Sequence, residues 1–180
     1  MELKAFEIQF VGLKAGKHEF SFEVDNTFFE NFGFDEFNSA DVAVTAFLDK
    51  RSTLMDLELT AKGAVNVDCD VSNVPFDHPV DAQLDLVVKF GEEFNDENED
   101  LLILPHGEFK FNIAQYVYEM IVLSMPAKKV HPGIENGTLE SDILDKLDEL
   151  SVDQPNDQNE DKEVDPRWDA LKKFKTDNNL

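Results

Sequence analysis

The sequence predicts an α+β fold: a curved antiparallel β-sheet or partly open barrel, with a buried apolar helix and peripheral helices. Apolar and polar residues alternate in six stretches of the first half of the chain, which is typical of strands with one face in water. After Phe90 this alternation gives way to helix-like spacing. Because strands of parallel sheets are usually apolar on both faces, the alternation favours antiparallel pairing.

Each alternating stretch is expected to form one strand. The stretches lie at residues 6–10, 20–24, 42–48, 55–59, 65–69 and 80–90. A turn from Gly12 to Gly16 joins the first two strands. Between the second and third strands, Asp25 or Asn26 caps a short helix that turns its phenylalanines inward. These phenylalanines are Phe28, Phe29 and Phe32.

The second half begins with an acidic stretch and continues with helices. Residues 92–100 carry six acidic residues and no basic one, so we expect a solvated, mobile loop. The apolar residues 101–104 indicate another short strand. Asn112 is expected to cap a helix that runs to about Ser124 and stops at Pro126. This helix is apolar over most of its circumference, which is typical of a buried helix.

The chain has 180 residues, enough for one domain and a tail. We expect a single α+β domain over residues 1–150, ending in an amphipathic helix capped by Ser141. Residues 151–164 have almost nothing to bury, so they predict an acidic, flexible linker. Residues 165–180 are expected to form a short basic amphipathic helix, because proline follows an aspartate cap at their start.

Charge narrows the choice of partners. The chain has 16 basic and 39 acidic residues, a formal net charge of -23. Phosphate backbones repel such a molecule at long range, which makes direct binding of nucleic acid an uncertain expectation. The carboxylates either serve solubility alone or attract a basic protein partner, and both interpretations remain open.

Cysteine usage and apolar runs indicate the compartment. Cys69 is the single cysteine, so no intramolecular disulfide can form and a reducing compartment is expected. The start of the sequence lacks the basic and apolar runs of a signal peptide, and no run reaches the roughly 20 apolar residues of a membrane span. We therefore expect a cytoplasmic protein without membrane contact.

No motif for catalysis or metal binding was found in the sequence. Cys69 lies on the apolar side of its strand and is expected to pack as a small hydrophobe. The four histidines lack metal-binding spacing. They are His18, His78, His106 and His131. Phosphate loops and nucleophile turns are missing as well, so we expect no enzyme, cofactor or metal.

Two segments are candidates for partner binding. Lys128 and Lys129 follow the apolar helix. Their positive charges either stabilise the helix C-terminus or form a basic patch for a partner. The last helix carries Trp168 behind the acidic linker, so it either packs on its own domain or docks on a partner. The predicted partner-binding residues are Pro166, Arg167, Trp168, Leu171, Lys172, Lys173, Lys128 and Lys129.

Three stretches resemble one family. Val67–Phe76 is similar to a strand followed by a Cys-x-x-Cys-x-x-Pro-Phe turn, and Phe111–Pro126 is similar to a helix with a central glutamate and a terminal Leu-x-x-Pro. Asp165–Phe174 contains an Asp-Pro-Arg signature. In this order they resemble the YceD family, the bacterial large ribosomal RNA subunit accumulation proteins.

The sequence departs from this family pattern at its cysteines. Ser72 stands where many members have the second cysteine of the turn, and the later cysteine cluster is missing between His131 and Ser141. A metal site formed by those cysteines in relatives is therefore not expected in this chain.

The resemblance implies a non-catalytic role in producing or stabilising large-subunit ribosomal RNA during ribosome assembly. The leading hypothesis is an assembly factor that contacts a basic ribosomal or assembly protein on the large ribosomal subunit precursor. The alternatives are direct binding of ribosomal RNA through a local basic patch, an acidic adaptor unrelated to ribosomes, and an undiscovered hydrolase.

Overall fold

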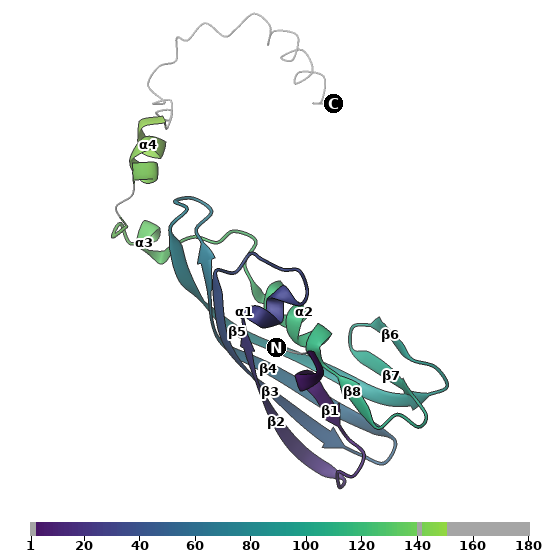
Figure 1. Cartoon of the computed structure of the whole chain (residues 1–180). Coiled ribbons are helices and arrows are strands. Elements are labelled where there is room, and N and C mark those ends of the chain that lie inside the picture. Colours follow the sequence, from purple (N-terminus) through teal and green to yellow (C-terminus); the bar gives the residue numbers. More distant parts are fainter. Residues whose placement is uncertain (1–2, 140–141, 151–180) are drawn as a thin grey trace, which may run out of the picture. The chain divides into compact units, whose positions relative to one another are not determined.

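Alternating apolar residues build a six-stranded sheet in the computed structural model, which describes residues 3–139 and 142–150 (Figure 1). Its strands, in spatial order, are β2 (Gly16–Asp25), β3 (Ser39–Lys50), β4 (Leu54–Asp68), β5 (Pro75–Gly91), β7 (Leu101–Pro105) and β6 (Asn95–Asn98). The pairs from β2 to β5 are antiparallel, as the alternation predicts. The sheet is open, with edges at β2 and β6, and within the described residues it does not close into a barrel.

One strand of the sheet unites two predicted strands. The stretches 55–59 and 65–69 were expected as two strands, and this prediction is wrong, because both belong to the single strand β4. Ala61 and Gly63 lie at odd-numbered positions, as do the buried residues on either side of them. The same side of the strand therefore faces the core along its whole length. At Gly63 the strands approach so closely that a Cβ atom would overlap the backbone oxygen of Asp41.

Strands also form in and after the acidic stretch. Residues 92–100 were expected as a loop, but β6 forms within them and pairs antiparallel with β7. Because β6 reverses the chain between β5 and β7, β7 lies parallel to β5, with Val88 opposite Leu102. This parallel pair was not predicted. The charged residues of β6 occupy the sheet edge, where charge discourages pairing with other chains.

The first strand pairs with a strand that lies about a hundred residues later in the sequence. β1 (Glu7–Gln9) follows a short 3-10 helix, η1 (Leu3–Phe6), and pairs antiparallel with β8 (Lys110–Asn112) in a two-stranded sheet. The Gly12 to Gly16 turn therefore connects two strands that lie in different sheets.

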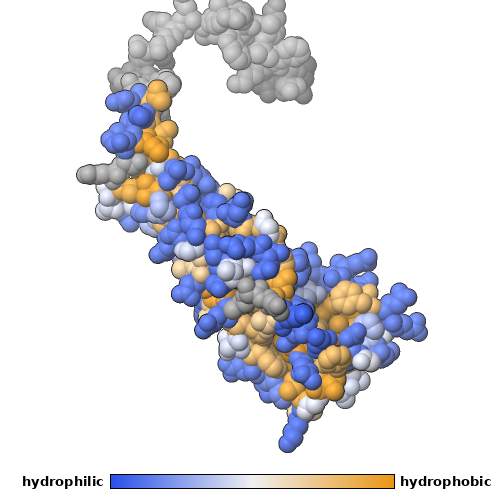
Figure 2. Space-filling model, in the orientation of Figure 1, coloured by the Kyte–Doolittle hydropathy of each residue, from blue (hydrophilic) through white to orange (hydrophobic). Residues whose placement is uncertain are grey.

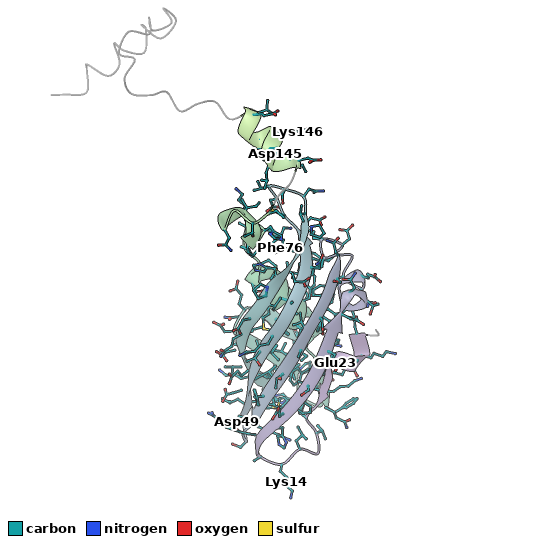
Figure 3. All side chains as sticks on the ribbon, turned by 90° about the vertical axis from the view of Figure 1, so that its left-hand side faces the viewer. Lys14, Glu23, Asp49, Phe76, Asp145 and Lys146 are labelled. Atoms are coloured by element: carbon teal, nitrogen blue, oxygen red, sulfur yellow. The ribbon has the colours of Figure 1, made fainter. Side chains whose placement is uncertain are left out.

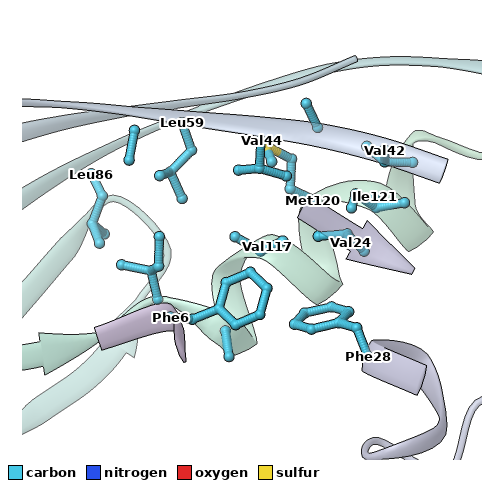
Figure 4. Close-up of a cluster of buried hydrophobic side chains, with 14 of the residues drawn as sticks. Phe6, Val24, Phe28, Val42, Val44, Leu59, Leu86, Val117, Met120 and Ile121 are labelled. Atoms are coloured by element: carbon cyan, nitrogen blue, oxygen red, sulfur yellow. The ribbon is translucent and has the colours of Figure 1, made fainter. Parts of the chain in front are cut away.

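A layer of short elements covers one face of the large sheet. It consists of η1, the β1–β8 pair and two helices, α1 (Asn26–Glu30) and α2 (Ala114–Ser124) (Figure 1). Phe6, Phe28 and Val117 point from this layer toward the sheet, where Val44 and Leu59 face them (Figure 4). All five side chains are buried. The other face of the sheet is left to solvent.

One predicted helix cap is confirmed and the other is displaced by one residue. The Asp25 carboxylate accepts a hydrogen bond from the Phe28 N–H at 3.2 Å, which confirms Asp25 as the N-cap of α1. At α2 the Asn112 side chain accepts from the Ala114 N–H at 2.7 Å, although Ile113 holds the cap position. The helix α2 is buried along one side only, since the Leu123 side chain is 81% exposed.

Two more helices follow. The short α3 (Pro132–Glu135) is capped by the His131 ring, which accepts from the Gly133 N–H. The predicted second amphipathic helix is present as α4 (Asp142–Leu150), and it belongs to a second unit, Asp142–Leu180. Its expected cap residue, Ser141, lies outside the described residues. No helix in the described ranges has the length and apolar character to cross a membrane.

Candidate protein-interaction site

One of the two lysines in the predicted basic patch is held by its neighbours. The Lys129 ammonium lies 3.4 Å from the Glu36 carboxylate. The backbone of Lys129 also bonds to Asp70 in both directions, since the Asp70 carboxylate accepts from the Lys129 N–H and the Lys129 carbonyl accepts from the Asp70 N–H. Lys128 is exposed beside it. Lys129 thus ties the segment after α2 to the turn after β4, and a binding role for either lysine stays a prediction.

The other predicted partner-binding residues cannot be placed. Pro166, Arg167, Trp168, Leu171, Lys172 and Lys173 lie outside the described residues, as do the predicted linker and last helix.

The turn that carries Cys69 is closed by hydrogen bonds to sulfur. The Cys69 sulfur accepts from the Ser72 N–H at 3.5 Å and from the His131 N–H at 3.2 Å. Asn73 completes the turn with a left-handed φ of 56°, a conformation that asparagine tolerates better than most residues. Burial raises the pKa of the Cys69 thiol, but hydrogen bonds from the Ser72 side chain and from the backbone outweigh it and lower the pKa to about 7.

These residues do not fit a structural metal site. A single thiol is present, the second position of the turn is the buried hydroxyl of Ser72, and the His131 Nδ1 atom already accepts from Gly133. Over residues 3–139 and 142–150, no three His, Cys, Asp or Glu side chains are grouped to hold a metal ion. The turn is held by hydrogen bonds, and the Cys69 side chain is buried in the core as predicted.

The uncovered face of the large sheet is strongly acidic. Register places Glu19, Phe47, Glu58 and Asp85 side by side across β2 to β5, in one continuous row. Figure 3 looks onto this face, with Glu23 and Asp49 labelled on its strands. We call it the acidic sheet face, defined by the outward residues of β2 to β5.

Other rows of the acidic sheet face differ in charge, and the row of Ser21, Thr45, Thr60 and Gln83 is neutral. Lys62 stands between Ala43 and Asp81 in its row. At the far end of the strands, the Arg51 guanidinium lies 2.7 Å from Asp56 and 3.6 Å from Asp49. Carboxylates thus outnumber the basic residues on this face.

A second candidate is a cavity of about 580 Å³ between the β6–β7 hairpin, β8 and α2. Its floor consists of the buried side chains of Leu102, Leu104 and Phe111. Phe94 stands at its rim with 57% of its side chain exposed. Figure 2 shows apolar surface over the strands that Figure 1 labels β6, β7 and β8. We call this site the hairpin cavity.

The rim of the hairpin cavity is negative. Asp96, Glu108 and Glu119 line it, and its one lysine, Lys110, lies 2.6 Å from the Glu7 carboxylate. Burial, with the charges of Asp96 and Glu119, raises the pKa of Tyr116 to about 12, so this phenol stays neutral and can donate a hydrogen bond.

Sequence reasoning missed the hairpin cavity. Asp96 and Phe94 were assigned to a mobile loop, although the exposed Phe94 within that stretch and the apolar run behind it were a usable signal. An aromatic residue in an otherwise charged stretch is a candidate contact residue.

Comparison with known proteins places the chain in a family. Residues 57–175 match the family model described as "Large ribosomal RNA subunit accumulation protein YceD". This range begins in β4, includes the Cys69 turn, the hairpin cavity and α2, and reaches the Asp-Pro-Arg stretch. No curated protein and no solved structure matches the chain. The match covers more than half of the sequence, and the chain therefore belongs to the YceD family, whose name assigns it a role in the accumulation of large-subunit ribosomal RNA.

Proposed function

We propose that this chain supports accumulation of large-subunit ribosomal RNA as a non-catalytic assembly factor, working in the cytoplasm. It does so by contacting a basic ribosomal or assembly protein on the large-subunit precursor. Shielding a cationic protein until it reaches its RNA site requires no chemistry, only a complementary surface.

The observation that carries this proposal is the acidic sheet face. In the row Glu19, Phe47, Glu58 and Asp85, three of the four positions carry carboxylates. Strands lie about 4.8 Å apart, so Glu58 and Asp85 are one spacing apart and Glu19 lies two spacings from Glu58, all on a rigid support. Extended lysine- and arginine-rich segments match this arrangement, and long-range attraction speeds their encounter with it.

The same charge opposes direct binding of RNA. A protein that binds a phosphate backbone needs clustered cations, whereas on the sheet Lys62 lies opposite Asp81 and the Arg51 guanidinium contacts Asp56. The basic patch at Lys128 and Lys129 is small, and Glu36 and Asp70 lie against it.

The experiment is recovery of the tagged full-length chain from cell lysate at low and at moderate salt, with and without ribonuclease. We expect basic large-subunit or assembly proteins to be recovered after ribonuclease treatment, with less of them at higher salt. Recovery of ribosomal RNA without such proteins would contradict the proposal and favour direct RNA binding.

Charge-reversal variants locate the contact. Replacing Glu58, Asp81 and Asp85 with lysine is expected to abolish recovery of the basic proteins, because these residues lie on the acidic sheet face. The matched control replaces Asp142, Asp145 and Glu149 of α4 with lysine, which changes the net charge equally at another place. Equal losses in both variants would show that total charge matters and the sheet face does not.

A further inference from the structure

The hairpin cavity has the composition of an anchor pocket. Leu102, Leu104 and Phe111 give it an apolar floor, and its volume of about 580 Å³ lies within the 300–1,000 Å³ that is usual for binding pockets. Phe94 extends the apolar surface outward at the rim. A large side chain that entered the cavity would bury apolar surface against this floor.

A second exposed aromatic residue lies beside the rim. Phe109 stands between the lining residues Glu108 and Lys110, and 49% of its side chain is exposed. The Lys110 ammonium lies 5.6 Å from the centre of the Phe109 ring. Aromatic residues at the edge of a desolvated pocket are typical of the centre of a protein–protein interface.

Charge identifies the occupant. Asp96, Glu108 and Glu119 surround the opening, and the ammonium of Lys110 is held by Glu7. An anionic ligand would therefore be repelled, while lysine or arginine beside the anchoring side chain would meet carboxylates.

We propose that the hairpin cavity binds a segment of a basic partner protein, with one tryptophan or similarly large apolar side chain in the cavity and lysine or arginine residues against its rim. This inference rests on the proposed function for the nature of the partner, and it adds a second contact surface with a specific anchor. The acidic sheet face supplies attraction without selecting a sequence, whereas the cavity selects the anchor.

The test uses the full-length chain and two fluorescein-labelled peptides at moderate salt. One peptide has a central tryptophan flanked by lysine and arginine residues, and the other has serine in place of the tryptophan. We expect the tryptophan peptide to bind about tenfold more tightly by fluorescence anisotropy, as for a well-buried interface anchor.

Two pairs of variants show which surface of the chain causes the tenfold preference for the tryptophan peptide. Phe94→Ser and Glu119→Lys alter the hairpin cavity, and their matched controls Phe47→Ser and Glu58→Lys alter exposed residues of the acidic sheet face. Phe94→Ser should remove the preference for tryptophan, whereas Glu119→Lys should weaken both peptides because it reverses a rim charge. Phe47→Ser should keep the preference for tryptophan, and Glu58→Lys should keep it while weakening both peptides equally. All four positions are exposed, so thermal unfolding should confirm that each variant folds.

The outcomes separate the two proposals. Equal affinity for both peptides, or loss of the tryptophan preference in Phe47→Ser alone, would overturn the cavity inference and leave the proposed function in place. In the opposite case, the parent chain prefers the tryptophan peptide and Phe94→Ser loses this preference, while the lysate experiment recovers no basic protein. That result would overturn the proposed function only.

A photo-crosslinking peptide identifies the occupied surface directly. With benzoylphenylalanine in place of tryptophan, we expect labelling of cavity residues such as Phe94 and Tyr116. Labelling of Phe47 or Val87 would overturn the inference. A Trp168→Ala chain that binds the tryptophan peptide about tenfold more tightly than the parent would also overturn it, because the cavity would then belong to the chain's own tryptophan.

Discussion

The sulfur of Cys69 accepts a hydrogen bond from the backbone N–H of His131, 3.2 Å away and 62 residues along the chain. This contact joins the turn after β4 to the segment that leaves α2. A thiolate accepts such bonds more strongly than a thiol, so ionisation of Cys69 and closure of the turn are linked.

Stability should therefore depend on pH through Cys69. Its pKa is lowered to about 7 in the folded chain, below the ordinary value near 8.5 of an unfolded cysteine. A depressed pKa stabilises the fold above the unfolded value, and this stabilisation is lost as pH falls toward 7. We expect the free energy of unfolding in urea to gain up to about 2 kcal/mol between pH 7 and 9.

The control for this prediction is Cys69→Ser, which keeps a polar acceptor but has no group that titrates in this range. The serine variant should lose most of the rise between pH 7 and 9. An unchanged rise in the variant would place the titrating group elsewhere.

Asp70 should matter more to stability than the lysine it contacts. Asp70→Ala removes the carboxylate that accepts from the Lys129 N–H, which should cost about 1 kcal/mol. Lys129→Ala removes only an ion pair at 3.4 Å and keeps the backbone bonds, so it should cost at most about 0.5 kcal/mol. Chemical denaturation of both variants measures the difference, and the reverse order would refute this account of the segment.

Gly63 should resist substitution. In Gly63→Ala the new methyl group would overlap the Asp41 backbone oxygen, so the strands β3 and β4 must separate, at a cost of about 1–3 kcal/mol. Lys62→Ala, at the exposed neighbouring position, should change stability by no more than about 0.5 kcal/mol. Equal melting temperatures for the two variants would show that the strands tolerate the methyl group.

Phe28 should be among the most important core residues. It is fully buried and packs against the rings of Phe6, Phe29 and Phe32. Phe28→Ala should cost about 3–5 kcal/mol of unfolding free energy. Phe94→Ala removes an exposed ring of the same size and should cost much less, so thermal unfolding of the pair separates core packing from surface aromatics.

The basic segment at the end of the chain should contribute to binding. We expect Arg167→Glu, Lys172→Glu and Lys173→Glu together to reduce co-sedimentation of the full-length chain with large ribosomal particles, because they reverse its local charge. Deletion of residues 165–180 should have the same effect. Unchanged co-sedimentation in both variants would remove these residues from the partner-binding set.

Local patterns predicted most of the sheet because strand alternation is a property of neighbouring residues. The prediction divided β4 where Lys62 and Gly63 interrupt the apolar residues, since a glycine in a strand has no side chain to show its face. The parallel pairing of β7 escaped prediction for another reason. It depends on β6 turning the chain back, and an acidic stretch gives little sign of that.

The candidate sites were less predictable because they depend on contacts between distant segments. Lys129 meets Glu36 and Asp70 only in the folded chain, so its charge looked available in the sequence. The hairpin cavity likewise needs Phe94 and Tyr116 to face the same space from different elements. The acidic sheet face was easier to anticipate, because net charge and strand alternation together predict it.

The pairing of β1 with β8 sets an order for building the molecule during translation. Residues 7–9 leave the ribosome first, yet their partners at 110–112 are made about a hundred residues later, roughly 5–20 s at usual elongation rates. The hairpins from β2 to β5 join neighbouring segments and can form in the meantime. For that interval Ile8 has no partner strand, which makes this segment a natural substrate for chaperones.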